Sequence, residues 1–169
     1  MRFSRRVCLG LLACVFCAGA FSPVFPCAWG GEGGARYVNA RYGFSVLLPK
    51  GHVSFNEPDN GDGATFRYPE GMVVRVYGTL SPSVMDRDCK ATFENDSQSF
   101  DTLTYKRLNE KKNWFVLSGY KEGDIRYMKC FVGKTAAYVI DMQYPREQAS
   151  RYDGFVRAAA GSFSPGTLQ

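Results

Sequence analysis

Residues 112–133, KNWFVLSGYKEGDIRYMKCFVG, constrain the fold more than any other stretch, because they predict a β-hairpin that is apolar on both faces. The turn is expected at the Lys-Glu-Gly-Asp sequence between the two apolar runs. Successive side chains of a strand point to opposite faces, so Trp114 and Val116 lie on one face and Phe115 and Leu117 on the other. A strand that is apolar on both faces is covered on both faces. The hairpin therefore belongs to a sheet that has a layer on each side.

The second strand of the hairpin has the same two-sided character. Its two apolar sets are Ile125, Tyr127 and Phe131 on one face and Met128, Cys130 and Val132 on the other. A third strand is predicted at 136–144, after a Gly-Lys turn and before Pro145. All three strands need covering elements.

Two helices are the predicted covering elements. The first is expected within 81–99, where Ser81 or Ser83 can cap its start. Its apolar row recurs every four residues at Met85, Cys89 and Phe93, with Val84 and Ala91 off the row. The second is expected at 152–163, because apolar residues there recur at the spacing of one helix face. These residues are Tyr152, Phe155, Val156, Ala159 and Phe163, and Pro165 and Gly166 end the helix.

Shorter strands are predicted where apolar runs alternate with turn-forming residues. They lie at 42–49, 52–56, 64–68, 72–77 and 103–108. The expected fold class is α+β, with a central antiparallel sheet of about six strands flanked by helices.

The first 20 residues predict export. Three arginines within MRFSRR precede an apolar stretch at 7–16, and Ala18-Gly19-Ala20 follows, which is the pattern of a secretory signal peptide cleaved after Ala20. The apolar stretch is about half as long as a membrane-spanning helix, and no later window predicts one. The expected location is the periplasm or the extracellular space.

A lipid anchor is the alternative interpretation of the same segment. Leu11-Leu12-Ala13-Cys14 resembles a bacterial lipoprotein box, with Cys14 as the lipidated residue. The residues after Cys14 are apolar, whereas a mature lipoprotein usually begins with a polar tether, so cleavage after Ala20 is preferred.

The charge of the chain argues against a nucleic-acid partner. The full chain has 21 basic and 16 acidic residues, but Arg2, Arg5 and Arg6 belong to the predicted signal. The remaining 18 basic residues against 16 acids give a formal charge of only +2. Nucleic-acid binding requires a stronger and more clustered basic surface.

One folded domain is expected at 37–166, preceded by a flexible Pro- and Gly-rich leader at 21–36. The domain holds two cysteines, Cys89 and Cys130, which are a candidate disulfide in an exported protein. The bond would close a loop of about 40 residues and stabilise the fold by a few kcal/mol. Two buried free thiols are the open alternative.

The acidic loop at 57–63 holds the candidate binding residues Asp59, Asn60 and Asp62. Their oxygens suit calcium, and the neighbouring glycines would let the backbone wrap around an ion. Asp and Asn also form tight turns by bonding to their own backbone, and the loop lacks the closing glutamate of an EF-hand. A structural turn is the preferred interpretation, with a ligand or partner contact as the alternative, and no metal or cofactor is predicted.

No catalytic motif stands out. His52 is the only histidine, so a Ser-His-Asp or Cys-His mechanism would depend on it, and no GxSxG sequence accompanies it. A phosphate-binding loop, a dinucleotide fingerprint and HExxH are absent from the sequence. A pair of carboxylates, as in glycosidases, is not excluded.

Several short pieces together resemble a family of exported bacterial proteins of unknown function. The pieces are YGFSV at 42–46 followed by Pro49, NGDG at 60–63 with Phe66, VYG at 76–78, NWFVLSG at 113–119, Tyr144-Pro145, and SF at 162–163 with Pro165-Gly166. The first also resembles the entry to PsbP-like domains. This resemblance implies an antiparallel sheet between helices, and an assembly or binding role rather than catalysis.

The preferred function is therefore an exported accessory or binding protein of the cell envelope without catalytic activity. Its partner would be another envelope protein or a small ligand. An envelope hydrolase that uses a carboxylate pair or His52 is one alternative. An inhibitor or immunity protein that caps an enzyme is the other, and a concentrated apolar surface patch would favour it.

Overall fold

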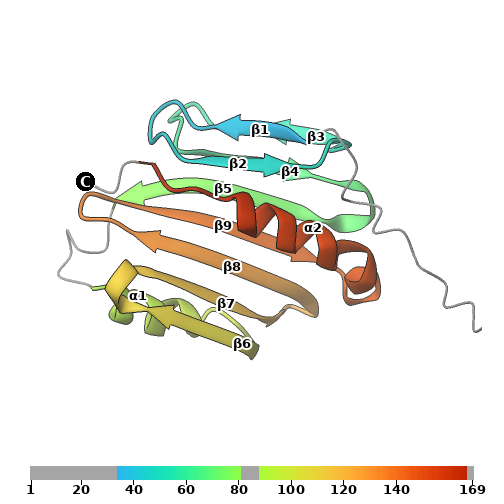
Figure 1. Ribbon diagram of the computed structural model, residues 1–169. Helices are drawn as coiled ribbons and strands as arrows, with labels where there is room; N and C mark the ends of the chain where they lie inside the picture. Colours follow the sequence, from blue (N-terminus) through green and yellow to red (C-terminus); the bar gives the residue numbers. More distant parts are fainter. Residues whose placement is uncertain (1–33, 81–87, 167–169) are drawn as a thin grey trace, which may run out of the picture.

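A seven-stranded antiparallel sheet forms the centre of the molecule, with the strand order β3-β4-β5-β9-β8-β7-β6 (Figure 1). The computed structural model describes residues 34–80 and 88–166. The strands of this sheet are β3 (Ser54–Asn56), β4 (Gly63–Arg67), β5 (Val73–Leu80), β6 (Thr102–Asn109), β7 (Trp114–Lys121), β8 (Asp124–Val132) and β9 (Ala136–Tyr144). Short 3-10 turns lie at η1 (Pro69–Gly71), η3 (Glu110–Lys112) and η4 (Arg146–Gln148).

The hairpin β7–β8 separates its apolar side chains into two cores, as its alternation predicts. Phe115 and Leu117 are buried with Met128 and Cys130 in one cluster, on the side of the sheet that faces helix α1 (Cys89–Ser97). Ile125, Tyr127 and Phe131 pack against the other cluster, on the side that faces helix α2 (Ala149–Ser162). The sheet is therefore packed on both faces, and the α+β fold class is confirmed.

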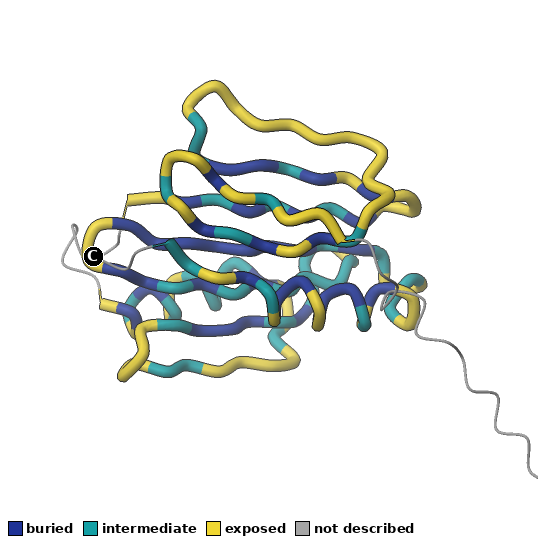
Figure 2. Tube along the Cα trace, turned by 45° about the horizontal axis from the view of Figure 1, so that its top comes forward, coloured by how far each residue is buried: buried dark blue, intermediate teal, exposed yellow. Residues whose placement is uncertain are grey.

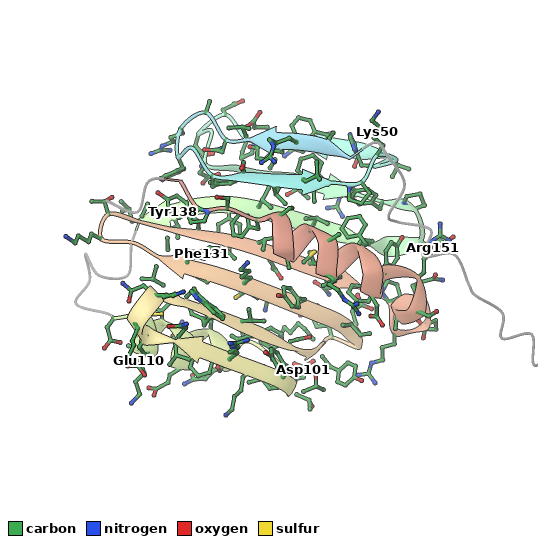
Figure 3. All side chains as sticks on the ribbon, viewed as in Figure 1. Lys50, Asp101, Glu110, Phe131, Tyr138 and Arg151 are labelled. Carbon is green, nitrogen blue, oxygen red and sulfur yellow. The ribbon has the colours of Figure 1, made fainter. Side chains whose placement is uncertain are left out.

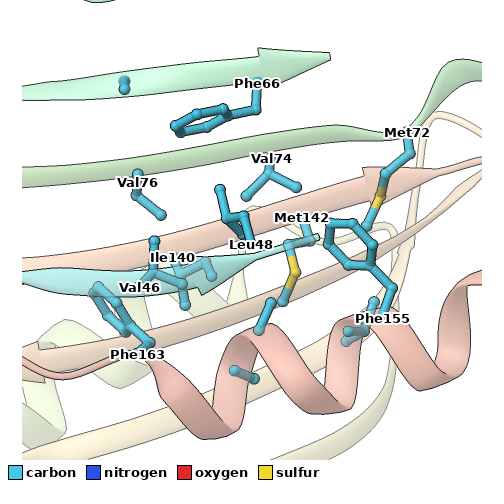
Figure 4. Close-up of a cluster of buried hydrophobic side chains, with 14 of the residues drawn as sticks. Val46, Leu48, Phe66, Met72, Val74, Val76, Ile140, Met142, Phe155 and Phe163 are labelled. Carbon is cyan, nitrogen blue, oxygen red and sulfur yellow. The ribbon is translucent and has the colours of Figure 1, made fainter. Parts of the chain in front are cut away.

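Helix α2 packs its apolar side chains into the hydrophobic cluster on its own side of the sheet. Tyr152, Phe155, Val156 and Ala159 are buried on its inner face, and Phe163 is buried directly after its last residue. Figure 4 shows Phe155 and Phe163 directed toward the strands of the sheet. The apolar spacing thus predicted the correct helix face, and the helix begins three residues before the predicted start.

A small hairpin shares the α2 face, which the sequence did not predict. Strands β1 (Ala35–Val38) and β2 (Ser45–Leu48) pair with each other in a separate two-stranded sheet and cover the main sheet beside α2 (Figure 1). Ser162 at the end of α2 accepts a hydrogen bond from the Leu47 amide at 2.9 Å, which joins the helix to β2. The first residues of β1 lie within the predicted leader at 21–36.

Helix α1 covers the opposite face. Its described part begins after Asp88, whose side chain accepts a hydrogen bond from the Ala91 amide at 2.7 Å. Phe93 packs edge-on against Phe115, with 5.7 Å between ring centroids. The residues 81–87, which include the predicted caps Ser81 and Ser83, lie outside the described residues. Neither described helix is long and apolar enough to cross a membrane.

The covering of the α2 face stops before the outer strand of the sheet. Most of β6 is exposed, and Figure 2 shows this strand as the most exposed strand at its edge of the sheet. Trp114 in the next strand is only partly buried. The layer formed by α2 and the β1–β2 hairpin therefore leaves part of the sheet open.

Candidate functional site

A groove of about 940 Å³ lies on the α2 face, between the helix and the uncovered strands β6 and β7. It is the candidate functional site because it combines volume, aromatic rings and cationic groups. Its lining residues are Tyr105, Arg107, Trp114, Val116, Ser118, Tyr127, Lys129, Phe131, Tyr144, Asp153, Val156, Arg157, Ala160 and Gly161.

Strands β6, β7 and β8 form the floor of the groove, and their register places the side chains in rows that run across the strands. Trp114 lies opposite Phe131, and these two rings form one aromatic row. Figure 3 shows Phe131 on the side of the sheet that α2 covers. Directly opposite residues of adjacent antiparallel strands have neighbouring side chains on the same face of the sheet.

The next two rows alternate in chemistry. Val116 lies opposite Lys129 on β8 and opposite Arg107 on β6, so an apolar residue separates two cations. Beyond it, Ser118 lies opposite both Tyr127 and Tyr105. A row of cations therefore runs between two rows of aromatic side chains.

Lys129 joins the floor of the groove to the helix. Its Nζ donates a hydrogen bond of 2.7 Å to the carbonyl of Ala160, in the last turn of α2. The last carbonyls of a helix have no partner within the helix, so this contact satisfies one of them. Nζ also lies 5.0 Å from the centre of the Phe131 ring. Burial lowers the pKa of Lys129 from its ordinary value.

Two arginines stand at the open side and at the helix wall. The Arg107 guanidinium lies 5.3 Å from the centre of the Trp114 ring, a cation–π contact. Arg157 projects from α2 and is exposed. Among the ion pairs of the described residues, neither arginine has an acidic partner.

The remaining polar groups of the groove are hydroxyls and one acid. Burial raises the pKa of Tyr127 to about 12. Burial and, to a smaller extent, the nearby carboxylate of Asp153 raise the pKa of Tyr144 to about 12. Both phenols are therefore neutral donors at neutral pH. The groove suits a ligand that has apolar rings and negative charge.

The predicted binding residues Asp59, Asn60 and Asp62 lie elsewhere, in the loop between β3 and β4. The Asn60 amide donates to the Asp62 carboxylate at 2.7 Å, and the carbonyl of Asn60 accepts from Arg41 at 2.8 Å. The carbonyl of Asp62 accepts from the Gly78 amide at 2.7 Å. These contacts bind the loop to itself and to β5. Within residues 34–80 and 88–166, no group of three or more His, Cys, Asp and Glu side chains could hold a metal ion.

His52 also lies away from the groove. Its ring contacts Phe66 at 5.6 Å and Tyr68 at 6.1 Å between centroids. With Tyr37, Leu48 and other side chains it lines a small apolar pocket of about 240 Å³. These contacts are with aromatic and aliphatic groups.

Two carboxylates approach one arginine on the α1 face. Arg126 donates to both oxygens of Asp141, at 2.9 and 3.2 Å, and to Ser99 at 2.9 Å. Asp96 on α1 also interacts with Arg126, and burial raises the pKa of the Asp96 carboxyl. Because both oxygens of Asp141 accept from Arg126, this cluster has the character of a structural ion pair.

Cys89 and Cys130 are buried free thiols in the structure, and both belong to the α1-face cluster. Burial raises the pKa of Cys89 to about 11 and that of Cys130 well above its ordinary value. The disulfide between them stays a prediction. Ala20 and Cys14, the predicted cleavage and lipidation residues, lie outside the described residues.

One feature of the sequence indicates the groove. Trp114, Tyr127, Lys129 and Phe131 occupy alternate positions of the two hairpin strands and hence one face. Alternation does not show whether a helix covers that face completely. Only the position of α2 over β8 and β9 leaves these side chains accessible.

The fold defines the class of the molecule: an α+β domain in which an antiparallel sheet lies between a helix-and-hairpin layer and a second helix. This is the PsbP-like fold. The solution structure of cyanobacterial PsbP (CyanoP) from Synechocystis sp. PCC 6803 is similar to this chain, with a TM-score of 0.56 and 16% identity over 80% of this chain and 96% of that chain. At this identity the likeness establishes the fold alone. Neither a protein-family model nor a curated protein matches the sequence.

Proposed function

We propose that the protein is an exported accessory or binding domain of the cell envelope, without catalytic activity of its own, and that the groove is its binding site. The partner is another envelope protein or a small ligand. The observation that carries this proposal is the open groove beside α2, where aromatic and cationic side chains of β6, β7 and β8 line one cavity with residues of the helix.

The chemistry of the groove supports binding rather than reaction. The phenols of Tyr127 and Tyr144 are neutral, and the Lys129 ammonium is bound to a carbonyl of the helix. Such groups orient and hold a ligand. A general base beside a nucleophile would favour the hydrolase alternative.

Site-specific crosslinking in living cells tests the proposal. A photoreactive residue replaces Tyr105, which is 51% exposed at the open side of the groove. The control position is Arg67, an exposed residue of β4. The expected result is an adduct from position 105 that is absent from position 67, identified by mass spectrometry of the purified protein. Equal adducts from both positions, or none from either, would contradict the proposal.

Export is tested on the same purified protein. Its location follows from fractionation of the cells, and its intact mass distinguishes cleavage after Ala20 from a lipid on Cys14. A full-length protein in the cytoplasm would overturn the proposed location.

The inhibitor or immunity role is a second candidate, because exposed apolar side chains occur on β1, β2 and β3 and at Val53, directly before β3. Val38 is 56% exposed, Leu47 41%, Val53 70% and Phe55 47%. Exposed apolar surface is typical of protein interaction sites. A photoreactive residue at Phe55 that captures a protein, when position 105 captures none, would favour this candidate over the groove.

A further inference from the structure

We propose that the groove binds a small organic anion with a flat apolar ring, whose anionic group is held between Arg107 and Arg157. The inference rests on the proposed function, because it assigns a ligand class to the same groove. Two observations support the inference. Aromatic and cationic side chains alternate in rows across the strands that floor the groove, and the residues that line the groove carry more positive than negative charge.

The ring of the ligand is assigned to the aromatic rows. Trp114 and Phe131 lie on one side of the cation row, and Tyr127 and Tyr105 lie on the other. A flat ring in the groove can therefore pack against an aromatic side chain on either side of the cation row. Val116, which is 7% exposed, forms the apolar floor between them.

The anionic group is assigned to the cations because the groove has a surplus of positive charge. Arg107, Lys129 and Arg157 line it, against the single carboxylate of Asp153. Lys129 is already bound to Ala160, whereas the two arginines have no acidic partner among the described ion pairs. Guanidinium groups bind carboxylate, sulfonate or phosphate oxygens through pairs of hydrogen bonds.

The size of the ligand follows from the boundaries of the groove. Its volume of about 940 Å³ falls within the range of small-molecule sites. An extended peptide would add to the free edge of β6, but that strand has an irregular register between Leu103 and Tyr105 and presents the exposed Lys106. Bulges and lysines on edge strands oppose the addition of another strand. A small molecule is therefore the favoured occupant.

Naphthalene-2-sulfonate is the probe that tests this inference. A Trp29→Phe background leaves Trp114 as the single tryptophan, so its indole N–H resonance reports directly on the groove. Two matched probes separate the contributions: 2-naphthylmethylammonium keeps the ring and reverses the charge, and methanesulfonate keeps the anion without the ring. The expected result is saturable movement of the Trp114 resonance with naphthalene-2-sulfonate alone.

The residue assignment is tested with a charge-matched control. Arg107→Gln combined with Arg157→Gln removes two positive charges from the groove. Lys50→Gln combined with Arg67→Gln removes two from exposed positions outside it. The groove variant is expected to raise the Kd of the probe about tenfold or more, since two charge-assisted contacts are lost, while the control variant leaves it nearly unchanged.

Each outcome separates this inference from the function on which it rests. Equal binding of the cationic probe, or equal Kd values for the two double variants, would overturn the anion assignment. If no probe binds but position 105 captures a protein in cells, the ligand class is wrong and the proposed function stands. If the probe binds through the arginines but position 105 gives no adduct in cells, the ligand class stands and the proposed function fails.

Discussion

At the scale of single residues, the buried ion pair between Arg126 and Asp141 is joined by two hydrogen bonds on the α1 face. The Asp141 side chain is 8% exposed and that of Arg126 15%. Asp141→Asn is expected to destabilise the protein by about 3 kcal/mol, because the half-buried Arg126 guanidinium loses the carboxylate that binds it through two hydrogen bonds and keeps the smaller interaction with the charge of Asp96. Glu70→Gln breaks the exposed pair with Arg151 and should cost less than about 1 kcal/mol. Urea unfolding of both variants checks this, and equal losses would contradict it.

Asp96 gives the fold a pH dependence of known sign. Burial raises its pKa in the folded state, and the hydrogen bond from Asn95 and the charge of Arg126 offset this only in part. A raised carboxyl pKa means that the folded state binds more protons than the unfolded state, so stability falls as pH rises from about 4, the usual aspartate value, through the folded pKa. Asp96→Asn removes this loss. The stability of the variant relative to the wild type should increase as the pH rises above about 4, the usual aspartate value, whereas Glu94→Gln, on the exposed side of α1, should show no such increase.

The thiols of Cys89 and Cys130 are expected to react slowly with alkylating reagents in the folded protein, because both are buried and the thiolate is the reactive form. The rate is measured in a Cys27→Ser background, with and without denaturant. Fast reaction in the native state would contradict their burial. Thiols that react in denaturant only after reduction would show the predicted disulfide instead.

How far residue roles could be predicted depends on the range of the interactions that fix them. The two faces of β8 follow from local alternation, so Met128 and Phe131 were assigned to the correct sides. The accessibility of Trp114 depends on where α2, more than 30 residues later in the chain, meets the sheet. Sequence spacing carries no information on that position.

At the scale of elements, α2 is attached to the sheet mainly through its aromatic side chains. Phe155 is fully buried, and its ring lies 4.9 Å from that of Tyr68. Phe155→Ala is expected to cost about 3–5 kcal/mol, since it removes a buried ring and leaves a cavity. Ala158→Ser, on the exposed side of the same helix, should change the free energy of unfolding by less than about 0.5 kcal/mol. Comparable shifts in the two denaturation midpoints would contradict the packing shown in Figure 4.

Elements with a regular pattern could be predicted, whereas elements that depend on distant partners could not. Tyr152, Phe155, Val156 and Ala159 repeat along one face of α2, and buried residues alternate with less buried ones along most of β5. β1 has only four residues beside a Gly-rich stretch, and it exists because β2 pairs with it and Tyr37 packs on Phe66 at 5.6 Å. Asp88 caps the described start of α1. The sequence also offers Ser81 and Ser83 as caps, and local sequence does not distinguish among the three.

At the scale of the whole molecule, the two clusters share one sheet, so they are expected to unfold together. Strand β8 directs Met128 and Cys130 into the α1-face cluster, and Ile125 and Phe131 against the other. Neither cluster can lose its strands without exposing the other. This geometry predicts a single cooperative transition, as is usual for a domain of this size.

Two probes on opposite faces make this last prediction testable. In a Trp29→Phe, Cys27→Ser background, Trp114 fluorescence reports on the α2 face and alkylation of Cys130 under reducing conditions reports on the α1 face. Their denaturation midpoints should coincide. Phe155→Ala, a change confined to the α2 face, should lower both midpoints equally, because the sheet transmits the loss to the other cluster. A midpoint for Cys130 that stays in place while that of Trp114 falls would show that each face unfolds independently.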